Sequence, residues 1–320
     1  MRGKVFVTVQ NNHVQYKFTL NRNITILRGD SATGKTTLID MVRQYEFDRS
    51  GGVSIICEKE CRVIGGERWK EQLSLIRDSI VFIDEGNRFL KTPEFAAAVG
   101  KSSNYYVIAT RDFLPALPYS VDEIYGIANK TKGYGQIKRL YSGFKKLYFS
   151  DSSEKRIENY DLVIVEDSNA GYTFFRSALE NKKCKCISAK GKSNIAKTIL
   201  KAPQSTRILV IADGAAFGPE MESVLKAGYL RKVEIYLPES FEWLVLKSGL
   251  VEGSDIQEIL ADPSEYIESR EYFSWERFFT ALLTERTKDG YLAYNKKKLN
   301  PAYLREYEKT EILKETPLGE

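Results

Sequence analysis

Residues 24–40 read ITILRGDSATGKTTLID, and this stretch decides how the first half of the chain folds. An apolar run precedes a glycine-containing loop and helix-forming residues follow it, which is the order of strand, loop and helix in a phosphate-binding loop. The fixed positions of the pattern G-x-x-x-x-G-K-[ST] are occupied by Gly29, Gly34, Lys35 and Thr36. The alternative, a glycine turn beside a solvated lysine, leaves the flanking strand and helix unexplained.

The chemistry of this phosphate loop predicts a site for ATP. Glycines let the backbone curl so that several N–H groups point inward, and the N-terminus of the next helix adds partial positive charge there. Lys35 is expected to reach the β- and γ-phosphates, and the Thr36 hydroxyl to hold Mg²⁺. The predicted nucleotide-binding residues of the loop are Gly29, Asp30, Ser31, Ala32, Thr33, Gly34, Lys35, Thr36 and Thr37.

A second nucleotide-binding signal is the sequence SIVFIDE at residues 79–85. A buried strand that ends in two acids is expected to deliver Asp84 to the magnesium ion and Glu85 to the attacking water. Such strand ends are common, so this signal depends on the phosphate loop upstream. Lys35 and Glu85 are the predicted catalytic residues of an ATPase, and Thr36 and Asp84 are its predicted magnesium ligands.

Composition sets the class of protein. A chain of 320 residues with 42% hydrophobic and 28% charged residues is long enough for two globular domains. The first residues alternate like a strand and lack the apolar core of a signal peptide, and no apolar run approaches the length of a membrane span. We therefore expect a cytoplasmic protein that does not bind membranes. The net charge of +5 is compatible with a nucleic-acid partner but does not require one.

The cysteine and histidine content limits the chemistry. Four cysteines form two close pairs, which predict either reduced structural thiols or a zinc site assembled from both pairs; neither pair has the spacing of a zinc knuckle. His13 is the only histidine, which excludes a histidine–metal cluster and any serine–histidine triad not built on it. We expect His13 to be a polar turn residue. The cysteines are Cys57, Cys61, Cys184 and Cys186.

The first half of the chain predicts an α/β domain. Alternating and continuous apolar runs indicate a hairpin, further buried strands and two helices. A basic, glycine-containing turn is predicted at residues 130–135. The other predicted strands lie at residues 5–9, 14–20, 53–57, 105–110, 121–127 and 136–141, and the helices at residues 35–45 and 67–77.

This order of elements resembles the additional-strand catalytic-glutamate class of P-loop ATPases. In that class a strand inserted between the phosphate-loop strand and the acidic strand ends in a polar sensor, which implies that Thr110 or Arg111 lies near the γ-phosphate. The alternative is a strand end whose Arg111 pairs with Asp112 or another acid. No LSGGQ-like dimerisation signature is present. P-loop kinases remain a rival, but Asp84 and Glu85 favour water as the phosphate acceptor.

The second half of the chain repeats an alternation of strands and helices. Residues 143–159 are polar and charged and form a predicted linker. Alternating strands and helices indicate a parallel sheet, and acids at the strand ends are expected to meet at one edge. The predicted strands lie at residues 160–165, 184–188, 207–212 and 233–237.

This second half resembles the TOPRIM domain of topoisomerases, primases and overcoming-lysogenization-defect (OLD) nucleases, and a P-loop ATPase followed by TOPRIM is the order of that nuclease family. The resemblance implies that Glu166 and Asp213 are metal ligands and catalytic residues. Ala215 stands where the family has the second acid of Asp-x-Asp, and Asn169 and Ala170 stand where it often has another acid. Magnesium needs carboxylates, so a two-metal nuclease site requires substitutes. The candidates are Asp167, Glu220, Glu222, Glu239 and Glu242.

Residues 253–320 are predicted to be a helical C-terminal extension. Apolar residues between Trp275 and Leu283 recur at helix spacing and predict a core face. After them, bases and aromatic residues interleave, which predicts either a nucleic-acid contact or a solvated helix entry. The interleaved residues are Tyr291, Tyr294, Lys296, Lys297, Lys298 and Tyr303.

The sequence thus predicts a P-loop ATPase domain at residues 1–142 and a TOPRIM-like domain at residues 160–252. The expected function is ATP- and Mg²⁺-dependent hydrolysis coupled to a metal-dependent nuclease, acting on nucleic acid in defence or DNA maintenance. The alternative is an ATP-driven switch whose second domain has lost catalysis and binds a partner. The resemblance also implies a protein partner or homo-oligomer in which Arg111 or Arg88 acts across a subunit interface.

Overall fold

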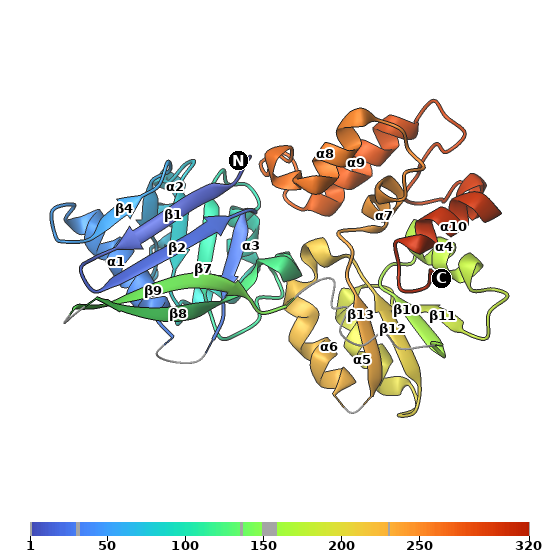
Figure 1. The fold of residues 1–320 in the computed structure, drawn as a ribbon, viewed down its shortest axis with the longest axis horizontal. Helices are drawn as coiled ribbons and strands as arrows, with labels where there is room; N and C mark the ends of the chain where they lie inside the picture. The colour runs from blue at the N-terminus through green and yellow to red at the C-terminus, as the bar shows by residue number, and fades with distance from the viewer. Residues whose placement is uncertain (1, 30–32, 135–136, 149–158, 230, 320) are drawn as a thin grey trace. The chain divides into compact units, whose positions relative to one another are not determined.

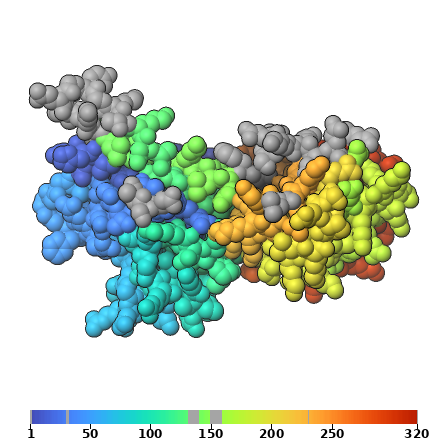
Figure 2. All heavy atoms as spheres, turned by 90° about the horizontal axis from the view of Figure 1, so that it is seen from below, coloured from blue at the N-terminus to red at the C-terminus, as the bar shows by residue number. Residues whose placement is uncertain are grey.

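The fold is that of a computed structural model, which describes residues 2–29, 33–134, 137–148, 159–229 and 231–319. The chain divides into two compact units (Figure 1). Unit 1 consists of Met1–Tyr148 and Ser264–Phe273, and unit 2 consists of Phe149–Pro263 and Ser274–Glu320. In Figure 2 the blue-to-green atoms are the bulk of unit 1, and the yellow-to-red atoms are the bulk of unit 2.

Unit 1 contains a mixed sheet, and the strands identified among its described residues follow the order β4-β1-β2-β9-β8-β3-β7-β6-β5. The strands from β8 through β3, β7 and β6 to β5 pair in parallel, whereas β1 pairs antiparallel with β2 and β4, and β8 with β9. The strand bounds are β1 Val5–Gln10, β2 Val14–Leu20, β3 Ile24–Leu27, β4 Ser54–Ile56, β5 Cys61–Val63, β6 Ile80–Ile83, β7 Tyr105–Ala109, β8 Ile124–Tyr134 and β9 Ile137–Lys146.

Helices cover both faces of this sheet. Helix α1 (Lys35–Phe47) contacts β1, β4, β5 and β6, so the sheet curls around it (Figure 1). The other face packs against α2 (Trp69–Leu75) and α3 (Pro93–Val99), where Trp69 stacks on Phe89 and Phe95 meets Phe89 edge-on. Every residue of β3, β6 and β7 is buried, as expected for parallel strands covered on both faces, and this explains their continuous apolar sequences.

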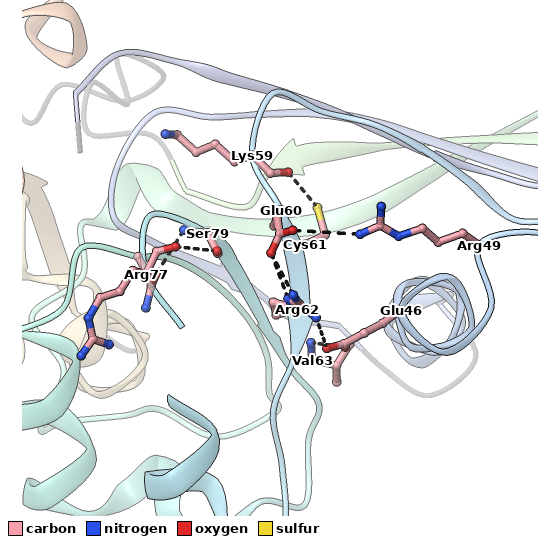
Figure 3. Close-up of polar contacts among 10 residues, drawn as sticks. Glu46, Arg49, Lys59, Glu60, Cys61, Arg62, Val63, Arg77 and Ser79 are labelled. Atoms are coloured by element: carbon pink, nitrogen blue, oxygen red, sulfur yellow. Dashed lines mark hydrogen bonds and ion pairs between the residues drawn. The ribbon is translucent and has the colours of Figure 1, made fainter. Parts of the chain in front are cut away.

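An ion-pair cluster ties the edge strand β5 to α1 (Figure 3). The Arg62 guanidinium pairs with Glu46 of α1 at 3.1 Å and with Glu60 at 2.9 Å. The second oxygen of the Glu46 carboxylate accepts a hydrogen bond from the Val63 backbone N–H at 3.0 Å. The helix that follows the phosphate loop is therefore anchored at its last turns.

Unit 2 contains a parallel sheet in the order β11-β10-β12-β13, counted over the part of the unit that the structure describes. The chain enters at β10, adds β11 on one side and then β12 and β13 on the other, so the topology switches between β10 and β12. The strand bounds are β10 Leu162–Val165, β11 Lys185–Ser188, β12 Arg207–Ile211 and β13 Lys232–Tyr236. The helix bounds are α4 Ala170–Ala178, α5 Ile195–Lys201, α6 Met221–Gly228, α7 Phe241–Lys247, α8 Ser254–Ala261, α9 Trp275–Thr287 and α10 Glu306–Lys314.

The α/β class and the main strands agree with the sequence predictions, although β5 and α3 were not predicted. Three predicted features also differ from the structure. The predicted turn at residues 130–135 is wrong, because β8 continues to Tyr134 and pairs with β9 along its length. Strand β9 runs to Lys146, so the predicted boundary at residue 142 falls inside a strand, where Phe144 stacks on Phe18 at 4.1 Å between ring centroids. Residues 253–320 are divided between the two units instead of forming a separate extension.

Candidate functional site

The phosphate loop connects β3 to α1, as the sequence predicts. Gly29 and Gly34 both have left-handed backbone angles, with φ of 144° and 97°, which side chains other than glycine rarely adopt. Gly34 is the N-cap of α1, and its carbonyl accepts a hydrogen bond from the Tyr16 hydroxyl at 3.0 Å. Asp30, Ser31 and Ala32 lie outside the described residues. The described part of the loop is thus held from both the helix and β2.

The Lys35 side chain folds back into this loop. It is 4% exposed, and its ammonium donates to the Gly29 carbonyl at 2.6 Å and to the Thr33 hydroxyl at 3.2 Å. A cation in this position faces the inside of the loop curve, where an anionic ligand would bind. The loop therefore presents a fixed positive charge together with the N-terminus of α1.

The acidic strand meets the phosphate loop at the predicted residues. Strand β7 lies between β3 and β6, so one strand separates the loop from the acids at the end of β6. The Thr36 hydroxyl donates to the Asp84 carboxylate at 3.5 Å, and the same carboxylate oxygen accepts from the Glu85 backbone N–H at 2.8 Å. The two predicted magnesium ligands are therefore adjacent, although they are 48 residues apart in sequence.

Glu85 is held by an arginine from the neighbouring strand. The Arg111 guanidinium donates from Nη2 and Nε to the two Glu85 oxygens at 2.8 and 3.2 Å. This pairing agrees with the alternative that Arg111 pairs with an acid at the strand end, and Asp112 pairs with Lys91 at 2.8 Å. Thr110 is 4% exposed, and its hydroxyl donates to the Asp112 carbonyl and accepts from the Asp112 N–H. Of the two candidate sensors, Thr110 is therefore hydrogen-bonded within a turn, and Arg111 pairs with the predicted catalytic acid Glu85.

The loop geometry makes Gly34→Ala a sharp test. An added Cβ would lie 2.9 Å from the Tyr16 hydroxyl, and the φ of 97° strains any larger residue. We expect a loss of about 1–3 kcal/mol in the free energy of unfolding and weaker nucleotide binding, measured by urea unfolding and ATP titration. Gly52→Ala is the matched control, because Gly52 has φ of 82° but no atom within 4 Å of the added Cβ. Equal effects of the two substitutions on nucleotide binding would contradict the role of Gly34.

The predicted acids of unit 2 also meet, at the carboxyl edge of its sheet. Glu166 follows β10 and Asp213 follows β12, and these strands are adjacent. The Glu166 carboxylate accepts a hydrogen bond from the Asp213 backbone N–H at 3.0 Å. A hollow of about 160 Å³ lies beside them. We call it the acidic pocket, and its polar lining includes Glu166, Asp167, Asp213, Glu242, Glu276, Tyr294 and Lys296.

Lys296 supplies the positive charge of the acidic pocket. Its ammonium lies 2.5 Å from a Glu276 oxygen and 3.5 Å from a Glu242 oxygen, and the Tyr294 hydroxyl donates to that same Glu242 oxygen at 2.8 Å. Tyr294 and Tyr303 are buried. The predicted nucleic-acid or solvent-facing role is therefore wrong for these two buried tyrosines, whereas the half-buried Lys296 turns its ammonium toward the carboxylates of the acidic pocket.

The structure also decides among the predicted substitute acids. Asp167 and Glu242 line the acidic pocket, whereas Glu220, Glu222 and Glu239 are not part of its lining. Glu242 is 1% exposed and lies in the first turn of α7. Glu276 was missed, because it lies on α9 in a sequence whose periodicity indicates only a core-facing helix.

Burial and mutual repulsion among the acids govern the charge state of the acidic pocket. Burial raises the pKa of Glu166 to about 7 and raises the pKa of Asp213 well above its ordinary value, where Glu276 and Glu166 add to the effect. Burial alone would lower the pKa of Lys296, but the carboxylates of Glu242 and Glu276 outweigh it and raise that pKa. Among the residues that the structure describes, no three acidic, cysteine or histidine side chains are placed to hold one metal ion. The Lys296 ammonium is the cation within this arrangement.

The remaining candidates have structural positions. All four cysteines are free, with one pair in each unit, and the described residues contain no group that would hold zinc. His13 lies in the turn between β1 and β2, where the Asn11 side chain accepts hydrogen bonds from the backbone N–H groups of His13 and Val14, both at 2.8 Å. The prediction that His13 is a turn residue is confirmed.

No protein-family model matches this chain, and no curated protein sequence matches it. None of the helices in the described ranges is both long and apolar enough to span a bilayer. The assignment of function therefore depends on the geometry of the two sites.

Proposed function

We propose that unit 1 binds ATP with Mg²⁺ and hydrolyses it. The observation that carries this proposal is the 3.5 Å contact between Thr36 and Asp84 beside the buried Lys35 ammonium. A hydroxyl and a carboxylate oxygen side by side are the hard ligands that magnesium prefers, so the residues present fit the ion. When bound, Mg²⁺ would neutralise charge on the β- and γ-phosphates, and Lys35 would hold the same groups from the loop.

Glu85 is proposed to orient and deprotonate the attacking water. It follows Asp84 directly, so the acid that acts on water would lie next to the acid that holds the metal. Its ion pair with Arg111 at 2.8 Å must open or shift for that role. Arg111 would then be free to reach the phosphates. Arg88 is exposed in the segment after β6, and it is the other arginine proposed to act on the nucleotide across a subunit interface.

ATP binding is tested by titrating the protein with a fluorescent ATP analogue in the presence of Mg²⁺. Lys35→Ala is expected to weaken binding by about tenfold or more, because it removes a buried charge from the loop. Lys145→Ala is the control, since Lys145 is exposed on β9. Unchanged affinity in Lys35→Ala would contradict the proposed site. Release of phosphate to water rather than to a second substrate distinguishes a hydrolase from a P-loop transferase.

For unit 2 we infer that the acidic pocket is the functional site. It lies at the carboxyl ends of β10 and β12, where the strand order switches and where ligands of open α/β sheets bind. The clustered upward pKa shifts of its acids also support a site. The first candidate function is metal-dependent cleavage of nucleic acid that uses Glu166 and Asp213. The carboxylates as placed do not fit a metal ion, so we assign no catalytic step to one.

The second candidate function is an ATP-driven switch whose unit 2 binds a partner without cleaving it. Two observations favour it: the Lys296 ammonium takes the cation position among the carboxylates, and Ala215 is buried in the turn after Asp213. A calorimetric titration with Mn²⁺ separates the candidates at the level of binding. A metal-dependent enzyme predicts binding that Asp213→Ala reduces, and a partner-binding switch predicts the same binding by both proteins, due to unit 1 alone.

A further inference from the structure

We propose that unit 1 carries a second anion site, a basic hollow that binds the phosphodiester backbone of nucleic acid. The hollow has a volume of about 520 Å³ and lies beside α2 and α3. It is distinct from the phosphate loop and from the acidic pocket, with which it shares no lining residue. Its basic residues are Lys70, Arg77, Lys101 and Arg270.

These four cations are available to a ligand. All four side chains are exposed, and none forms an ion pair with an acid among the described residues. Arg77, labelled in Figure 3, donates from Nη1 to the Ile76 carbonyl at 2.8 Å, which fixes its guanidinium near the end of α2. A bound phosphate would therefore break no internal salt bridge, and its attraction to these exposed cations would depend on salt.

The shape and composition of the hollow favour a polymer of phosphates over a single ion. Its cations come from separate segments, namely α2, the turns after α2 and α3, and the 264–273 segment. A free phosphate occupies only a small part of about 520 Å³. Asp78 is the one acid in this lining, and the apolar floor includes Trp69 and Leu73. Exposed cations spaced around an open hollow contact successive phosphates without reading the bases.

The hollow and the phosphate loop lie at opposite ends of the same parallel strands. Asp78 comes just before β6 and Ser103 just before β7, whereas the magnesium ligand Asp84 follows β6 at its other end. Nucleic acid and ATP are therefore expected to bind unit 1 together, without competition. This inference gives the proposed ATPase a partner and does not depend on cleavage by unit 2.

The test is fluorescence anisotropy with labelled single-stranded DNA, duplex DNA and RNA of about 20 nucleotides, in EDTA so that no metal-dependent cleavage occurs. Lys101→Glu combined with Arg270→Glu is expected to weaken binding at least tenfold and to reduce the slope of log affinity against log salt by about 2. Lys17→Glu combined with Lys145→Glu is the control, because both lysines are exposed on other strands of unit 1. Thermal unfolding shows whether each variant is folded.

Three outcomes would overturn the inference. The first is equal loss of affinity in the two double variants, which would indicate a general charge effect. The second is displacement of nucleic acid by inorganic phosphate or ATP at matched ionic strength, which would identify a small-anion site. The third is binding of an acidic peptide with an affinity equal to that of nucleic acid. Failure of ATP hydrolysis would leave this binding measurement unaffected, so the two proposals fail separately.

Discussion

Glu85→Gln is expected to lower the rate of ATP hydrolysis by about 10²–10⁴-fold while ATP still binds. Glutamine keeps the size of the side chain but cannot accept a proton from water. Lys35 and Thr36 do not contact Glu85 in the described hydrogen bonds, so the nucleotide contacts should persist. The measurement is phosphate release at saturating ATP and Mg²⁺, together with the affinity for the fluorescent ATP analogue.

The matched control for this substitution is Glu94→Gln. Glu94 is exposed in the first turn of α3 and takes no part in the site. Hydrolysis by Glu85→Gln at the rate of Glu94→Gln would identify Glu85 as a plain strand-end acid. Loss of both binding and hydrolysis would instead indicate that the pair between Glu85 and Arg111 holds the site together.

Glu166→Gln is expected to stabilise the protein, and more so at pH 8 than at pH 5. Burial raises the pKa of Glu166 to about 7, whereas an unfolded glutamate titrates near its ordinary value. The folded state therefore holds a proton that the unfolded state releases, and this contribution to stability is lost as the pH rises toward 7. At pH 8 the buried carboxylate costs about 3 kcal/mol, which glutamine removes. We expect a rise of about 6–12 °C in the melting temperature of the transition of unit 2 at pH 8.

Thermal unfolding at the two pH values measures this effect. Glu180→Gln is the control, because Glu180 is exposed in the same unit. A stabilisation that is equal at pH 5 and pH 8 would contradict the charge argument. A destabilised Glu166→Gln protein would mean that the hydrogen bond from the Asp213 N–H requires the charged carboxylate.

The nucleotide site could be predicted because its signals are local. The spacing of the loop motif identifies Lys35 and Thr36. The acidic strand β6 is separated from β3 by one strand, and its end brings Asp84 beside Thr36. The engagement of Glu85 by Arg111 needed the register of neighbouring strands, which the sequence does not specify. For the same reason, the sequence left open which acid Arg111 pairs with, and the structure shows that this acid is Glu85.

The acidic pocket was only half predictable. Glu166 and Asp213 come at strand ends, where periodicity and the parallel-sheet rule place them together. Glu276 and Lys296 reach the pocket from helix α9 and the segment after it, more than 60 residues further along the chain than Asp213. No sequence pattern indicated that these two residues pack against the edge of the sheet. A lysine near tyrosines has the same local sequence whether its ammonium faces solvent or a carboxylate.

The most direct test of whether the ATPase controls cleavage of nucleic acid by unit 2, or only the binding of a partner, is incubation of the purified protein with linear, supercoiled and single-stranded DNA and with RNA. The reactions contain Mg²⁺ or Mn²⁺, with and without ATP, beside the Lys35→Ala and Asp213→Ala variants. If the ATPase is coupled to a nuclease, Asp213→Ala abolishes cleavage. In Lys35→Ala, cleavage no longer responds to ATP. Wild-type protein that hydrolyses ATP but cleaves nothing under any condition would contradict the nuclease and leave the partner-binding switch.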